Sequence, residues 1–114
     1  MRPKPSISGR AEADLTNQYG WYLGNAGQQV AERFLAAFDA TVERLSQIPE
    51  LGRPRRFRDR ELTDLRSVSV RGPFGAHLIF YRSGEAGISI ERVMHGARDL
   101  PHRLLEAPEG FPSA

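Results

Sequence analysis

The sequence contains no cysteine, which excludes a disulfide framework and a thiolate metal site and is typical of a reducing compartment. No apolar run approaches the roughly 20 residues that span a bilayer, and the first residues lack the apolar core of a signal peptide. The three histidines, His77, His95 and His102, do not have the spacing of a metal site. These absences predict a cytoplasmic protein with no membrane contact, no metal and no other cofactor.

Lysine is nearly absent, since 15 of the 16 basic residues are arginine and only Lys4 is lysine. Two explanations stay open: a GC-rich genome, or selection for forked donors that pair with phosphate or carboxylate. The formal net charge is only +2, but residues 53–61 contain five arginines against two acids. This segment is either a basic clamp for an anionic partner or a solvated loop.

The length of 114 residues suits one domain with a single core. We expect residues 1–105 to form that domain. Residues 106–114 have no periodicity and contain several turn formers, which is typical of a flexible tail.

Three β-prone runs at residues 65–70, 76–82 and 88–94 predict an antiparallel meander, because glycine and proline separate them. The middle run is apolar at nearly every position, so both of its faces should be covered. The outer runs alternate between apolar and polar residues. We therefore expect one side of the sheet to face the core and the other side to be partly open.

A short strand at residues 4–7 is expected to precede the first helix, with Ser8 as the N-cap and Gly24 near the helix end. Asn25 is the predicted N-cap of the next helix, with Gln28 completing a capping box. Because the connection is so short, the two helices should form an antiparallel hairpin.

The second helix, at about residues 26–47, has an apolar face wider than one contact requires. Leu35 and Val42 widen this face, which either packs internally or leaves a strip for a partner. A short helix over residues 101–105 should follow the strands and lay leucines on the core. The fold class is therefore α+β: a short strand and a helix hairpin on a small, mainly antiparallel sheet, with a short C-terminal helix.

Four stretches in this order resemble the RelE/ParE superfamily of bacterial toxins, with the ParE branch the nearer match. They are Ala-Asp-Leu at 13–15, Ile-Pro-Glu-Leu-Gly-Arg at 48–53, His-Leu-Ile-Phe-Tyr-Arg at 77–82 and Ile-Glu-Arg-Val-Met-His-Gly-Ala-Arg-Asp at 90–99. The similarity covers about residues 5–100. It implies a RelE/ParE-like fold and a toxin that poisons DNA gyrase. It also implies neutralisation by the C-terminal segment of a cognate, ParD-like antitoxin, through which alone the toxin would meet operator DNA.

The RelE branch of the superfamily instead cuts mRNA on the ribosome, which requires proton-transfer groups and cationic donors on one face. RelE-like nucleases place Lys or Arg with Tyr there, but this chain has no lysine beyond Lys4 and no tyrosine after Tyr81. The nearest equivalents are Arg71, Tyr81, Arg92 and His95. Alternation puts Tyr81 and Arg82 on opposite faces, and a bulge near Arg92 and Val93 would swap the faces that they occupy. A ribosome-dependent nuclease, and an inactive relic that binds only its antitoxin, therefore stay open as alternatives.

The resemblance suggests two sets of candidate binding residues, and neither set is expected to bind a metal. Residues for target binding are Arg71, Arg82, Arg92, His95 and Arg98. Residues for antitoxin binding are Trp21, Tyr22, Leu35, Val42, Arg55, Arg56 and Arg58, and the matching antitoxin surface should be acidic. The alternative role for Arg92 and Arg98 is a structural pair with Asp99, and the alternative for Trp21 and Tyr22 is burial in the core.

Overall fold

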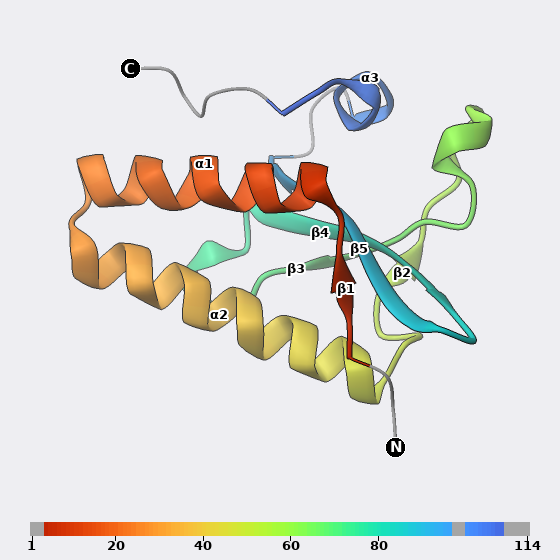
Figure 1. The fold of residues 1–114 in the computed structure, drawn as a ribbon, viewed down its shortest axis with the longest axis horizontal. Coiled ribbons are helices and arrows are strands. Elements are labelled where there is room, and N and C mark those ends of the chain that lie inside the picture. Colours follow the sequence, from red (N-terminus) through yellow and green to blue (C-terminus); the bar gives the residue numbers. More distant parts are fainter. Residues whose placement is uncertain (1–3, 97–99, 109–114) are drawn as a thin grey trace.

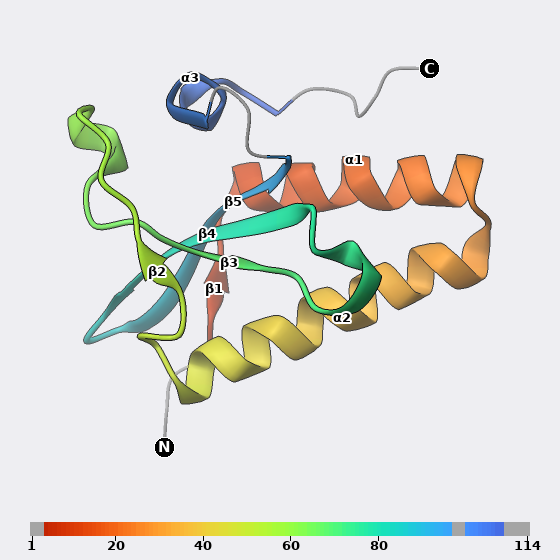
Figure 2. The same ribbon diagram turned by 180° about the vertical axis from the view of Figure 1, so that it is seen from behind.

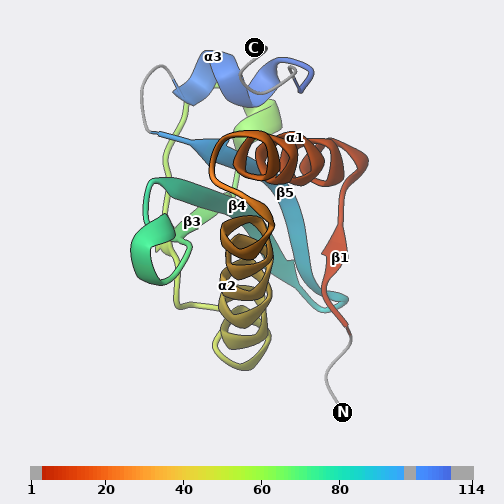
Figure 3. The same cartoon turned by 90° about the vertical axis from the view of Figure 1, so that its left-hand side faces the viewer.

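The computed structural model describes residues 4–96 and 100–108 and confirms the α+β prediction. Two N-terminal helices pack on a five-stranded mixed sheet, and α3 lies on the far side of α1 from α2 (Figures 1 and 3). The helices and strands are β1 (Ser6–Ile7), α1 (Gly9–Asn25), α2 (Gln28–Gln47), β2 (Arg53–Pro54), β3 (Arg66–Ser69), β4 (His77–Gly84), β5 (Gly87–His95) and α3 (Leu100–Leu105). The 3₁₀ turns η1 (Arg60–Leu62) and η2 (Gly72–Phe74) flank β3.

The sheet has the strand order β1-β5-β4-β3-β2. The predicted antiparallel meander is confirmed as β3, β4 and β5. The N-terminal strand is also confirmed, although it is short, and it pairs in parallel with β5. The edge strand β2 was not predicted, because its two residues belong to the arginine-rich segment and contain a proline.

A bulge in β5 decides which side chains share a face. Tyr81 lies opposite Ile90 and Phe80 lies opposite Arg92, so Glu91 has no register partner. The extra residue brings Ile90 and Val93 onto the same face. The bulge lies at Glu91, next to the position at which the sequence suggested one. The prediction that Tyr81 and Arg82 point to opposite faces is confirmed, because Tyr81 is fully buried in the helix-side core and Arg82 is partly exposed.

The main core lies between the helix hairpin and the sheet. Its buried members include Ala11, Phe34, Phe38 and Leu45 from the helices, Ile79, Tyr81, Ile88, Ile90 and Val93 from the sheet, and Val70 just after β3. Leu35 and Val42 pack against it while keeping part of their surface exposed. The helical stripe therefore faces the sheet, as its periodicity predicts.

The opposite face of the sheet is more covered than we expected. A second buried cluster consists of Leu62, Leu65, Phe80, Met94, Leu100 and Leu104. The expectation of a partly open face is corrected here, since α3 and the segment around η1 bury these side chains. The prediction that the C-terminal helix lays leucines on the core is confirmed.

The two helix starts differ in how they are capped. Ser8 is the N-cap of α1, as predicted, and its Oγ accepts the Ala11 N–H at 3.0 Å. The predicted capping box of α2 is wrong, because Asn25 is still in α1 and its amide donates to the Trp21 carbonyl. Gly27 precedes α2 instead, with φ at +94° and no side-chain cap. Glycine adopts this backbone conformation without steric cost, and so allows the tight turn.

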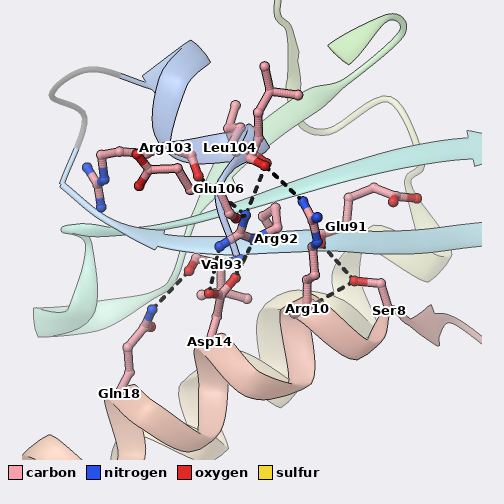
Figure 4. A network of polar contacts seen from close by, with 12 residues as sticks. Ser8, Arg10, Asp14, Gln18, Glu91, Arg92, Val93, Arg103, Leu104 and Glu106 are labelled. Carbon is pink, nitrogen blue, oxygen red and sulfur yellow. Dashed lines mark hydrogen bonds and ion pairs between the residues drawn. The ribbon is translucent and has the colours of Figure 1, made fainter. Parts of the chain in front are cut away.

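A buried ion pair joins α1, β5 and α3 (Figure 4). Arg92 donates from Nε to Asp14 Oδ2 at 2.8 Å and from Nη2 to Asp14 Oδ1 at 3.0 Å. The same carboxylate accepts the Val93 N–H, and Arg92 Nη1 donates to carbonyls at the end of α3, including that of Leu104 at 3.0 Å. Both charged residues are only 5% exposed. Arg92 is therefore a structural residue whose acid is Asp14.

The segments on either side of α3 are described only in part. Arg98 and Asp99 lie outside the described residues, so their proposed pairing stays a prediction. Of the expected tail, residues 106–108 are described, and the Glu106 carbonyl accepts a hydrogen bond from Arg92. Residues 109–114 lie outside the described part.

We expect Asp14→Asn to lower the free energy of unfolding by about 3–5 kcal/mol, because it leaves a buried guanidinium without its counter-ion. Glu91→Gln is the control, since it removes a partly exposed pair with Arg82 at 3.6 Å and should cost less than about 1 kcal/mol. Urea unfolding of both variants measures the two values. Equal small losses would show that the buried pair does not hold the three elements together.

Candidate interaction surface

Tyr81 is fully buried and links the break after α2 to the sheet. Its hydroxyl accepts the Gly52 N–H at 2.7 Å and donates to the Pro49 carbonyl at 2.8 Å. Burial raises the pKa of Tyr81. A Cβ at Gly52 would lie 2.6 Å from the Tyr81 ring, so only glycine allows this approach. The Tyr81 side chain therefore stabilises the fold and is not accessible to a substrate.

The four residues suggested for nuclease chemistry are not gathered on one face. Tyr81 belongs to the helix-side core, whereas Arg92 is buried on the other side with Asp14. Arg71 is exposed just before η2, and His95 is the last residue of β5. Partial desolvation and the charge of Arg103 lower the pKa of His95, because both disfavour the protonated form of its imidazole.

The residues suggested for target binding are also spread over different environments. Arg71 is exposed. Arg82 keeps some exposure, but it donates to the Thr63 carbonyl at 2.8 Å and pairs with Glu91. His95 is exposed, with its ring 4.7 Å from that of His77. Since Arg92 is buried and Arg98 is outside the described residues, Arg71, Arg82 and His95 are the described candidates that remain at the surface.

His77 is a buried polar centre that the sequence analysis did not single out. It is fully buried, with Nδ1 at 2.8 Å from Gln18 Oε1 and Nε2 at 2.7 Å from the Tyr22 hydroxyl. Burial, together with the nearby His95, lowers its pKa to about 4, so it is neutral near pH 7. The signal in the sequence was the spacing of Asp14 and Gln18, which share the buried face of α1 with Ala11 and have partners on β5.

The aromatic residues at the end of α1 contribute to the core as well as to the surface. Tyr22 packs against Phe34 and Phe74, with ring centroids 5.2 and 5.5 Å away. Trp21 is partly exposed and meets Tyr22 edge to face. Tyr22 is therefore partly committed to packing, and contact of Trp21 with a partner stays a prediction.

The arginine-rich segment projects from the edge of the sheet between β2 and β3 (Figure 2). Arg55 is partly buried, with its guanidinium 5.6 Å from the Phe80 ring centroid and 5.7 Å from that of Phe57. Its Nη1 donates to Ser67 Oγ at 3.1 Å. Burial, followed by the charge of Arg53, lowers the pKa of Arg55. One arginine of this segment is therefore held in a defined position.

A groove of about 550 Å³, which we call the Arg55 groove, lies beside this side chain. It is lined by Pro54, Arg55, Arg56, Phe57, Leu62, Thr63, Asp64, Leu65, Arg66 and Ser83. Three arginines and one acid lie among apolar side chains there. Arg56 and Arg58 are exposed, which leaves both available to a partner.

Metal-binding clusters and membrane-crossing helices are both absent from residues 4–96 and 100–108. No group of three or more histidine, cysteine, aspartate or glutamate side chains there could hold a metal ion. None of the helices in the same ranges has both the length and the apolar character needed to cross a membrane.

Comparisons with known proteins agree with one another. The family described as the ParE toxin of the type II toxin-antitoxin system, parDE, matches residues 6–100. The chain is 30% identical to Toxin ParE1 of Caulobacter vibrioides over 89 residues, which cover 78% of this chain and 84% of that protein. This match includes most of both chains.

Two solved structures share the fold. The chromosomal ParDE TA system from P. aeruginosa gives a TM-score of 0.67 at 19% identity, covering 84% of this chain and 98% of that chain. The YoeB-YefM complex from Staphylococcus aureus gives a TM-score of 0.52 at 15% identity, covering 85% of this chain and 100% of that chain. At these identities the likeness establishes the fold alone.

The buried His77 predicts a dependence of stability on pH. The pKa of His77 is 6.5 in the unfolded chain and about 4 in the folded chain. Between these two pH values the histidine is therefore protonated in the unfolded chain but stays neutral in the folded chain. The free energy of unfolding should therefore fall by up to about 3 kcal/mol as the pH drops through this range. Urea unfolding measured at several pH values should show a flatter dependence for His77→Gln. The exposed His102→Gln is the control and should keep the wild-type slope, and an unchanged slope in His77→Gln would contradict the assignment.

Proposed function

The chain belongs to the ParE toxin family of type II toxin-antitoxin systems, and on this basis we propose that it inhibits DNA gyrase by binding it. A cognate antitoxin, ParD-like or similar, neutralises the toxin by wrapping it with its C-terminal segment. Both proteins act in the cytoplasm. The toxin reaches operator DNA only through the antitoxin.

We favour binding over bond cleavage because the side chains of Tyr81 and Arg92 are buried and hydrogen-bonded within the fold. A metal-free nuclease needs proton-transfer and cationic groups that converge on one reacting phosphate. Here the Tyr81 hydroxyl is bonded to Gly52 and Pro49, and the Arg92 guanidinium is bonded to Asp14. Neither group is available to a substrate, so the proposed toxin acts through its surface.

Surface residues then supply the contacts to the target. Arg71, Arg82 and His95 keep exposed area, and Arg98 is a further candidate outside the described residues. Arg71 is the most accessible of the described guanidinium groups in this set. Its fork suits a carboxylate on a protein target.

The antitoxin partner is supported by the family, which is that of a type II toxin-antitoxin system, and by the structural likeness to the ParDE TA system of P. aeruginosa. The surface for this partner combines apolar side chains with the arginine-rich segment. Its candidate residues are Trp21, Tyr22, Leu35, Val42, Arg55, Arg56 and Arg58. An acidic antitoxin segment complements their charge.

Stoichiometric toxin should block DNA supercoiling by purified gyrase and leave protein synthesis in a translation extract unchanged. Arg71→Gln should weaken the inhibition, because it removes an exposed donor fork. Arg33→Gln, which removes an exposed charge from α2, should inhibit as wild type does. Unimpaired supercoiling with wild-type toxin would reject the gyrase proposal. Cleaved mRNA in the extract would favour the nuclease. If the toxin neither blocked supercoiling nor cleaved mRNA, the inactive relic would be favoured.

The antitoxin should raise the melting temperature of the toxin, because it binds the folded chain and buries apolar surface. At a free concentration 100-fold above its Kd it should add about 2.7 kcal/mol. For a domain of this size the corresponding shift is on the order of 10 °C. Differential scanning calorimetry with and without the co-purified antitoxin measures it. An unchanged melting temperature would argue against a neutralising complex.

A further inference from the structure

We propose that the Arg55 groove receives a peptide segment of the antitoxin in which a carboxylate pairs with Arg55 and a neighbouring aliphatic side chain covers the groove floor. This inference rests on the proposed function, because it locates the antitoxin of that proposal on the toxin.

Arg55 is held in place before any partner arrives. Its guanidinium stacks beside the rings of Phe57 and Phe80, and Nη1 donates to Ser67 Oγ. Its backbone N–H donates to the Leu65 carbonyl at 2.8 Å, which continues the pairing of β2 with β3. A side chain already fixed loses little conformational freedom on binding, and its planar fork matches a carboxylate bidentately. Arg55 is therefore suited to anchor an acidic side chain.

Arg55 and Arg66 of the Arg55 groove have no ion-pair partner within the described chain, and Asp64 is the one acid among the three arginines of the lining. Arg55 donates to a hydroxyl, and Arg66 donates to the Gly52 carbonyl at 2.7 Å. None of the ion pairs among residues 4–96 and 100–108 involves either arginine. Arg53 lies close enough for its charge to disfavour the charged form of Arg55. A bound anion would relieve this repulsion.

The floor of the groove favours a peptide over a nucleic acid. Phe57, Leu62 and Leu65 line it, and all three belong to or pack on the second hydrophobic cluster. An aliphatic side chain can cover this surface, whereas a sugar-phosphate backbone brings no apolar group to it. The Phe57 ring is already stacked on Arg55, which limits its use for a nucleobase. The combination of a guanidinium and an apolar floor fits an alternating acidic and aliphatic sequence.

A fluorescein-labelled peptide of six Glu-Leu repeats tests the inference by fluorescence anisotropy with the full toxin chain. We expect Arg55→Gln to weaken binding by about 10-fold or more, which is the range of a lost charge-assisted hydrogen bond. Arg55→Lys should also weaken it, because lysine keeps the charge but loses the fork and the stacking. The matched charge control Arg33→Gln should stay within about twofold of wild type. A Gln-Leu peptide should bind at least about 10-fold more weakly than the Glu-Leu peptide.

Thermal unfolding of each variant establishes that it is folded at the assay temperature, and Arg55→Lys provides the test if Arg55→Gln is not. Wild-type affinity for the Glu-Leu peptide in a folded Arg55 variant would overturn the inference. A 12-nucleotide single-stranded DNA that binds more tightly than this peptide, and loses affinity in the same variants, would also overturn it. That outcome would identify the groove as a nucleic-acid site.

The same variants separate this inference from the function on which it rests. If Arg55→Gln toxin inhibits gyrase and is neutralised by the antitoxin with wild-type affinity, the groove assignment fails and the proposed function stands. If wild-type toxin leaves gyrase active but still binds the Glu-Leu peptide through Arg55, the proposed function fails and the carboxylate preference of the groove stands.

Discussion

The bidentate pair between Arg92 and Asp14 is the interaction on which the arrangement of the other elements depends. It joins α1 to β5, the last strand of the meander, and, through the carbonyls at the end of α3, fixes the C-terminal helix (Figure 4). Taking two charges out of water is costly. Here the cost is offset by the paired geometry, the Val93 N–H and the helix-end carbonyls, which together satisfy donors and acceptors on both side chains. Within the described residues, every fully buried side-chain polar atom has a hydrogen-bond partner.

Positions at which the superfamily comparison suggested chemistry hold the fold together in this chain, as Tyr81 does at Gly52 and Arg92 does at Asp14. Both side chains are buried among groups that already satisfy their donors. The exposed residues differ from them, since Arg71 and Arg56 present their charge at the surface. The binding function proposed above would use these exposed side chains.

The charge distribution matters more for that recognition than the net charge does. A formal charge of +2 would indicate little attraction to any partner. The structure concentrates arginine at one edge of the sheet, where neutral groups hold Arg55 and Arg66 in place and few acids oppose them. An acidic partner segment would meet both this charge and the apolar side chains beside it, so electrostatic attraction and hydrophobic burial would act at the same place.

Much of the local structure could be predicted from the sequence. Periodicity identified both long helices and the three meander strands, and Ser8 was identified as a cap, because these features depend on neighbours within a few residues. The resemblance to known toxins was likewise readable from short stretches. Other features were decided only by tertiary structure. Asp14 and Arg92 are 78 positions apart, His77 finds Gln18 across the fold, and Arg55 stacks on Phe80 from another strand. The bulge at Glu91 decides which residues of β5 share a face of the sheet. Its exact position depends on contacts between distant parts of the chain, which the spacing of residues does not reveal.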